Sequence, residues 1–159
     1  ITSIRQALIL LGVIKAKYWL RLMLYADMLS PDANPEILRM ALQRAHFLGE
    51  LGVASNFTAS KNESLFLVGM FSTLEAILGM PMNTLLRELP LSDEIKRALR
   101  GEPGMYADYL ALAVAMELLD FTRANKLARV LCLPENIVSK SFELAIEKSD
   151  AMMNQLADV

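Results

Sequence analysis

The feature that most constrains the fold is the stretch 65–89, LFLVGMFSTLEAILGMPMNTLLREL, because no other part of the chain is so apolar or so sharply punctuated. Over 63–78 few polar residues interrupt the apolar surface, and a helix that is apolar nearly all round is expected to be buried. Asn62 is a suitable N-cap for this helix, and Gly79 is a suitable left-handed stop. A second short helix, begun by a proline, is predicted over 81–89.

Helical spacing of apolar residues continues through the rest of the chain, and no stretch alternates as a strand does. Further helices are predicted over 3–11, 13–29, 35–53, 93–100, 105–119, 120–132 and 134–158, with Gly101 as the stop of the helix over 93–100 and 55–62 as a polar loop. In the last helix, residues at steps of three and four predict one long packing seam: Val138, Phe142, Ala145, Ser149, Met152 and Leu156. The sequence therefore predicts an all-α fold, organised as a single multi-helix domain over 1–159.

The apolar content is high for a chain of 159 residues, with 54% hydrophobic residues and a mean hydropathy of +0.34. No run of about 18 uncharged apolar residues is present, so a membrane span is not predicted. An apolar excess is also typical of a domain whose surface is covered by another part of a longer protein. Because Ile1 enters a predicted helix at once, without an initiator Met, we expect the chain to be a piece of a longer protein.

Cysteine content and charge limit the compartment and the partners. Cys132 is the single cysteine, which excludes an internal disulfide and favours a reducing, cytoplasmic location. The net charge is −2, so the chain as a whole does not attract nucleic acid or anionic lipid. Any binding of that kind would have to be local.

Residues that could carry catalysis are few. His46 is the single histidine, with Glu50 one helical turn later, and we interpret it as a surface histidine with local hydrogen bonds. A nucleophilic scheme built on His46 stays open, although no nucleophile elbow accompanies it. Glycine-rich phosphate loops are absent, and Gly69 is expected to permit a close approach between helices. No catalytic residue, metal ligand or cofactor is therefore predicted from these patterns.

A helix-turn-helix interpretation is possible over 123–140, because LARVLCLPENIVSK has the apolar spacing of many DNA-binding units. The cations that would contact phosphates are Arg123, Lys126, Arg129 and Lys140. Cys132 stands in the turn where glycine is usual, and the second helix carries three glutamates that phosphates would repel: Glu135, Glu143 and Glu147. We favour two packed helices joined by a proline turn, with DNA binding as the alternative.

Several segments together resemble a known family, the HDOD domain, a helical relative of the HD phosphohydrolases. The resemblance lies in ITSIRQALILLG, RAHFLGELG, LFLVGMFSTLEAILGMPMNTLLRELPLSDEIKRAL and ARVLCLPENIVSKSFELA. It is strongest to the version that follows an EAL domain in bacterial signalling proteins. It implies an HD-like helical bundle in which the first helices of the pattern and an upstream EAL domain lie before residue 1.

The resemblance also bears on activity. Catalytic HD enzymes read apolar-Gly-apolar-apolar-His-Asp in the central helix, and alignment on Gly69 puts Ser72 and Thr73 at the His-Asp positions. Neither side chain is a competent divalent-metal ligand there. The resemblance thus implies a non-catalytic signal-transduction domain, linked through the EAL domain to cyclic di-GMP. A residual metal-dependent phosphohydrolase holding Mn, Fe or Mg is the enzymatic alternative.

Protein–protein or interdomain contact is the function that remains for such a domain. The partner is expected to be another protein or the upstream EAL domain, and an oligomer is possible. Flexible thioethers and aromatic side chains suit an adaptable contact surface. The candidate partner-binding residues are Tyr18, Trp19, Tyr25, Met80 and Met82. A small ligand in the helical core would leave no trace in the sequence.

Overall fold

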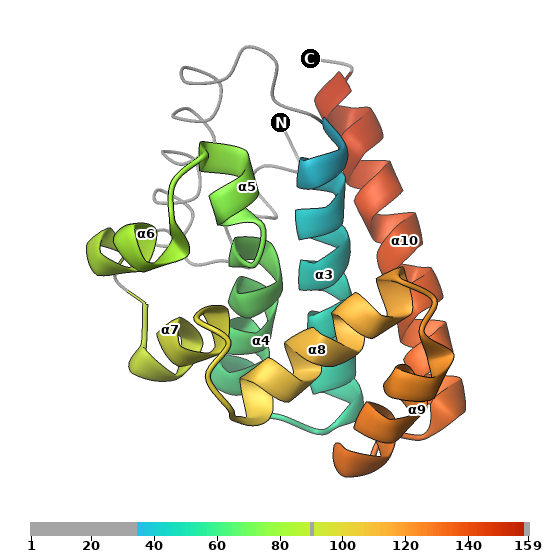
Figure 1. Cartoon of the computed structure of the whole chain (residues 1–159). Helices are drawn as coiled ribbons and strands as arrows, with labels where there is room; N and C mark the ends of the chain where they lie inside the picture. The colour runs from blue at the N-terminus through green and yellow to red at the C-terminus, as the bar shows by residue number, and fades with distance from the viewer. Residues whose placement is uncertain (1–34, 90, 158–159) are drawn as a thin grey trace. The chain divides into compact units, whose positions relative to one another are not determined.

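The computed structural model describes residues 35–89 and 91–157, apart from the side chains of residues 88 and 155–157, and these residues belong to one compact unit. Eight helices and no strand are found in this part of the chain, which confirms the all-α prediction (Figure 1). They are α3 (Pro35–Ala54), α4 (Ala59–Phe71), α5 (Leu74–Leu78), α6 (Met82–Glu88), α7 (Asp93–Leu99), α8 (Met105–Glu117), α9 (Phe121–Val130) and α10 (Glu135–Ala157). The helices predicted over 3–11 and 13–29 lie outside the described residues.

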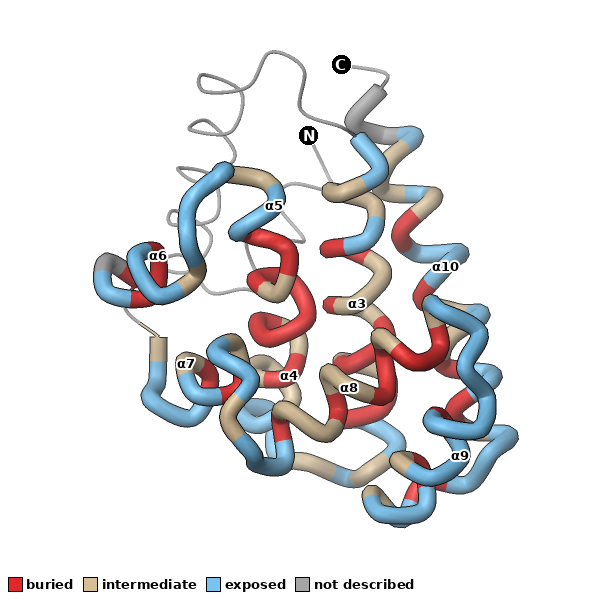
Figure 2. Tube along the Cα trace, in the orientation of Figure 1, coloured by how far each residue is buried: buried red, intermediate tan, exposed pale blue. Residues whose placement is uncertain are grey.

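The helix α3 is the centre of this unit, with α4 packed along one side, α10 along another and α8 crossing it (Figure 1). Figure 2 shows the buried residues gathered where α3, α4 and α8 face one another. The buried residues of α3 include Phe47, whose ring meets Phe142 of α10 edge to face at 5.2 Å between centroids. The predicted seam of α10 is confirmed at Val138, Ala145 and Ser149, all buried.

The predicted central helix over 63–78 is wrong as one continuous element. It begins earlier, because the Thr58 side chain accepts a hydrogen bond from the Lys61 N–H at 3.4 Å, so Asn62 is not its cap. It also breaks at Ser72 and Thr73 into α4 and α5. The Ser72 hydroxyl donates to the Gly69 carbonyl at 2.7 Å, and such a local bond competes with the helical pattern.

The helix ends depend on left-handed backbone positions. Gly79 and Gly101 have φ values of 62° and 76°, which confirms both as predicted stops. Cys132 takes φ 55° in the turn between α9 and α10, so it adopts the conformation that glycine usually supplies there. Leu119 is left-handed as well, at φ 57°, and α8 ends at Glu117 rather than at the predicted 119.

Among the described helices, none has the length and apolarity needed to cross a membrane.

Candidate functional site

A close contact between backbones positions the site. If Gly69 of α4 carried a Cβ, that atom would lie 2.6 Å from the backbone carbon and oxygen of Arg44 and from the nitrogen of Ala45. The predicted close helix approach at Gly69 is thereby confirmed. It brings α3 against α4 and places the Arg44 side chain beside the break that follows α4.

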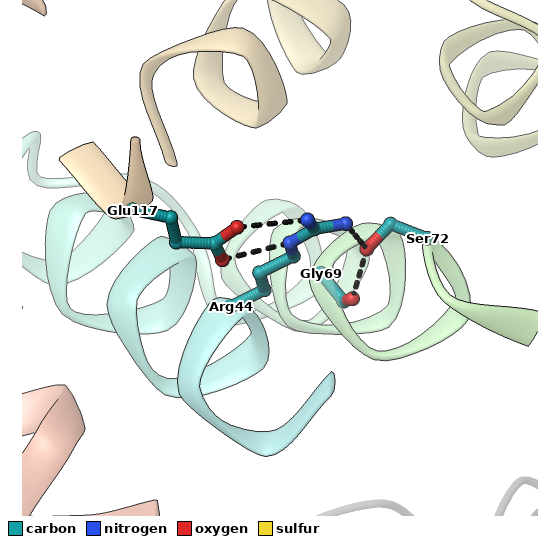
Figure 3. A network of polar contacts seen from close by, with 4 residues as sticks. All are labelled: Arg44, Gly69, Ser72 and Glu117. Carbon is teal, nitrogen blue, oxygen red and sulfur yellow. Dashed lines mark hydrogen bonds and ion pairs between the residues drawn. The ribbon is translucent and has the colours of Figure 1, made fainter. Parts of the chain in front are cut away.

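Arg44 is the centre of a polar network at that break (Figure 3). Its Nε and Nη2 donate to the two carboxylate oxygens of Glu117, both at 2.8 Å, and its Nη1 donates to the Ser72 hydroxyl at 3.0 Å. The two charged side chains are only 13% and 14% exposed. The Arg44 guanidinium thus donates two hydrogen bonds to Glu117 of α8 and one to Ser72 at the end of α4. The two bonds to Glu117 have the forked geometry that makes such pairs strong.

The network occupies the place where the resemblance aligns metal ligands. Ser72 takes the first of the two aligned positions, and its hydroxyl already accepts from a cation and donates to the Gly69 carbonyl. The hydroxyl of Thr73, at the second position, is buried and has no hydrogen-bond partner within the described part. A guanidinium next to these positions repels a divalent ion, and a neutral hydroxyl is a poor ligand for one. The residues present do not fit the HD-type metal.

Across residues 35–89 and 91–157, no group of three or more His, Cys, Asp and Glu side chains is arranged to hold a metal ion.

The interpretation of His46 as a surface histidine with local hydrogen bonds is wrong. Its Nε2 is buried without a hydrogen-bond partner among the described residues, and its ring lies edge-on to Phe66 with centroids 5.6 Å apart. Burial lowers the pKa of His46, Lys148 lowers it further, and Glu50 acts in the opposite direction. The polar face of α3 is covered by α10, whose Lys148 pairs with Glu50, and sequence periodicity could not reveal this cover.

The predicted partner-binding residues fall in two groups. Tyr18, Trp19 and Tyr25 lie outside the described residues. Met80 is 40% exposed and lies in the turn between α5 and α6, and the half-buried Met82 is the first residue of α6. The Met82 N–H donates to a Glu75 carboxylate oxygen at 3.1 Å, which ties α6 to α5.

A larger apolar surface lies at the turn between α8 and α9. Leu118, Leu119 and Phe121 are 70%, 67% and 56% exposed, and we call these three residues the LLF turn. Sequence reasoning missed it, because Leu118 and Leu119 continue the apolar pattern of α8 and were expected inside that helix. The left-handed conformation of Leu119 ends the helix and leaves both side chains in solvent.

The four cations of the DNA-binding alternative are exposed, three on α9 and Lys140 on α10. Residues 131–134 join the two helices, as the proline-turn interpretation expects. The three glutamates of α10 are exposed too, so that helix carries both signs of charge: Glu135, Glu143 and Glu147. No observation on these residues favours phosphate contact over simple solvation.

Most of the chain is similar to part of two longer bacterial proteins. It is 36% identical over 121 residues to the cyclic di-GMP phosphodiesterase CdgJ of Vibrio cholerae, a match covering 76% of this chain and 28% of that protein. This chain is thus similar to part of a cyclic di-GMP phosphodiesterase. It is also 32% identical over 133 residues to the uncharacterized protein YuxH of Bacillus subtilis, covering 82% of this chain and 32% of YuxH. The chain thus spans a third or less of these relatives.

No family model matches the chain. No solved structure matches it either.

Proposed function

We propose that this chain is a non-catalytic output domain of the HDOD type, acting in a cyclic di-GMP-related bacterial pathway. It works in the cytoplasm by binding a protein partner or an EAL domain upstream in the same polypeptide. The pathway is supported by the similarity to CdgJ, whose name gives it a cyclic di-GMP phosphodiesterase activity. The matched segment is 28% of CdgJ, and we propose that the phosphodiesterase chemistry resides in the remainder of such proteins.

The observation that carries the proposal is the Arg44–Glu117–Ser72 network. A metal-dependent phosphohydrolase needs ligands that converge on an open coordination position. Here Ser72, at the first aligned position, accepts a hydrogen bond from Arg44, which is paired with Glu117, and these bonds join α3, α4 and α8. A polar network of this kind specifies how helices pack, and it leaves no carboxylate free to bind an ion.

The LLF turn is the surface that we assign to the partner. Three large apolar side chains, each more than half exposed and within four residues of sequence, are typical of contact sites rather than of ordinary protein surface. The turn begins directly after Glu117, so a bound partner would lie next to the network that joins the helices. Met80 and Met82 stay candidates for a second contact.

The test is capture of partners from the lysate of the host bacterium by the tagged chain, with and without nuclease. The variant Leu118→Ser/Phe121→Ser should retain at least about tenfold less of the captured protein, as expected when apolar contact residues are removed. Val53→Ser is the matched control, because Val53 is 61% exposed and lies at the end of α3. Equal retention by the two variants would contradict the proposal, and loss of retention with nuclease would favour DNA binding.

A further inference from the structure

A hollow of about 410 Å³ lies between α6 and α7. Both helices carry exposed residues (Figure 2). Its lining consists of Asn83, Leu86 and Arg87 from α6, Asp93 and Lys96 from α7, and Arg100, which caps α7. Three of these side chains are cationic and one is anionic. The hollow is therefore locally positive in a chain whose net charge is −2.

The cations in this hollow have unused hydrogen-bond donors. Arg87 and Lys96 take part in none of the hydrogen bonds or ion pairs found among the described side chains. Arg100 donates from one Nη to Glu102 at 3.1 Å, and Glu102 is shared with Arg97, which donates at 3.0 Å. Most of the donors lining the hollow are thus available to an incoming acceptor.

A neighbouring hollow provides a contrast. It measures about 200 Å³ and its charged lining is balanced, with Lys61 and Arg97 against Glu94 and Glu102. Arg97 and Glu102 of this lining are hydrogen-bonded to each other. The charges lining the smaller hollow thus balance, whereas those lining the hollow between α6 and α7 are mainly positive.

We propose that the hollow between α6 and α7 binds a small anion that carries phosphate groups. Planar guanidinium groups such as those of Arg87 and Arg100 match phosphate oxygens in pairs, and Lys96 adds a point charge. The volume falls within the range of about 300–1,000 Å³ found for small-molecule sites. Leu86, only 2% exposed, provides an apolar floor, and Asn83 offers an amide to a neighbouring group of the ligand. Such a ligand would act as a signal to a domain that, under the proposed function, works by binding a protein.

Two probes test the site by isothermal titration calorimetry on the whole chain at physiological salt: inorganic pyrophosphate and cyclic di-GMP. The variant Arg87→Gln/Lys96→Gln removes two cations from the hollow. Arg123→Gln/Lys126→Gln removes two exposed cations from α9 and serves as the matched control. Circular dichroism melting of both variants shows that they are folded before binding is compared.

We expect saturable binding of at least one probe, weakened at least about tenfold in the α6–α7 variant and within about twofold of the unaltered protein in the control. Binding of pyrophosphate alone would assign the site to a small phosphate compound, and tighter binding of cyclic di-GMP would assign it to a nucleotide. Absence of saturable binding of both probes would overturn the proposal. Equal weakening in the two variants would also overturn it, because binding would then follow overall charge.

Discussion

Arginine is used in two opposite ways in this molecule. The Arg44 side chain is only 13% exposed between α3, α4 and α8, and its guanidinium is bonded to Glu117 and Ser72. Arg87, with Lys96 and Arg100, lines an open hollow and has no comparable partner among the described residues. A buried charge needs a partner in the fold, whereas an exposed one keeps its donors for a ligand. The contrast teaches that charge alone does not mark a binding site, since a cation binds a ligand only where the fold leaves it unpaired.

The first test of this contrast has the largest expected effect. Arg44→Met should lower the free energy of unfolding by about 3 kcal/mol, because Glu117 stays buried and loses its cationic partner. Arg39→Met is the control on the same helix. The Arg39 side chain is 35% exposed in its ion pairs with Glu36 and Asp150, so the loss there should stay below about 1 kcal/mol. Urea denaturation measures the free energy of unfolding of both variants. Equal losses would contradict the view that the Arg44 ion pair stabilises the fold more than the more exposed Arg39 ion pairs do.

The close helix contact beneath Arg44 can be broken separately. Gly69→Ala should lower the free energy of unfolding by about 2 kcal/mol, because its new methyl group would meet backbone atoms of α3 that have little room to move. Gly49→Ala is the control, since its Cβ would lie 3.7 Å from the Phe66 ring. That control should be neutral or stabilising by up to about 1 kcal/mol, as expected for alanine in a helix interior. Tolerance of Gly69→Ala would contradict the close packing of α3 on α4.

The Nε2 of His46 is buried without a hydrogen-bond partner among the described residues, so titration of this side chain should make the stability of the fold depend on pH. Burial lowers its pKa in the folded state, so the unfolded chain takes up a proton first as the pH falls through about 6.5. The free energy of unfolding should therefore decrease as the pH is lowered from about 7.5 to about 5.5. It should decrease less over that interval in the variant His46→Phe. Denaturation curves at the two pH values measure this difference, and parallel pH profiles for the two proteins would refute it.

Neutralising the open hollow should have the smallest effect on folding. Arg87→Gln/Lys96→Gln should change the free energy of unfolding by no more than about 0.5 kcal/mol, because neither side chain has a hydrogen-bond or ion-pair partner among the described residues. A loss of about 2 kcal/mol or more would mean that these cations are structural, as Arg44 is. Urea denaturation of this variant and of the unaltered protein measures the change in the free energy of unfolding.

Sequence patterns predicted those features that depend on local chemistry. The left-handed stops at Gly79 and Gly101 and the close approach at Gly69 follow from the small size and backbone freedom of glycine. The apolar seam of α10 follows from spacing alone. Such features need no knowledge of which helices become neighbours.

The candidate site depended on long-range packing and was missed. Arg44 and Glu117 lie 73 residues apart, so no spacing rule joins them. The cover of α10 over His46 and the position of α7 beside α6 are likewise set by tertiary contact. The break at Ser72 and Thr73 was hidden, because two hydroxyl residues within an apolar run do not by themselves indicate the end of a helix.

The most direct test of the account is the metal content of the purified chain. The protein is incubated with Mn²⁺, Fe²⁺ and Mg²⁺ in turn, separated from free ion by gel filtration and examined by elemental analysis. With Arg44 and Glu117 paired beside Ser72, the account predicts less than about 0.1 ion per chain for each metal. About one tightly held ion per chain, accompanied by hydrolysis of a phosphodiester, would contradict the non-catalytic assignment.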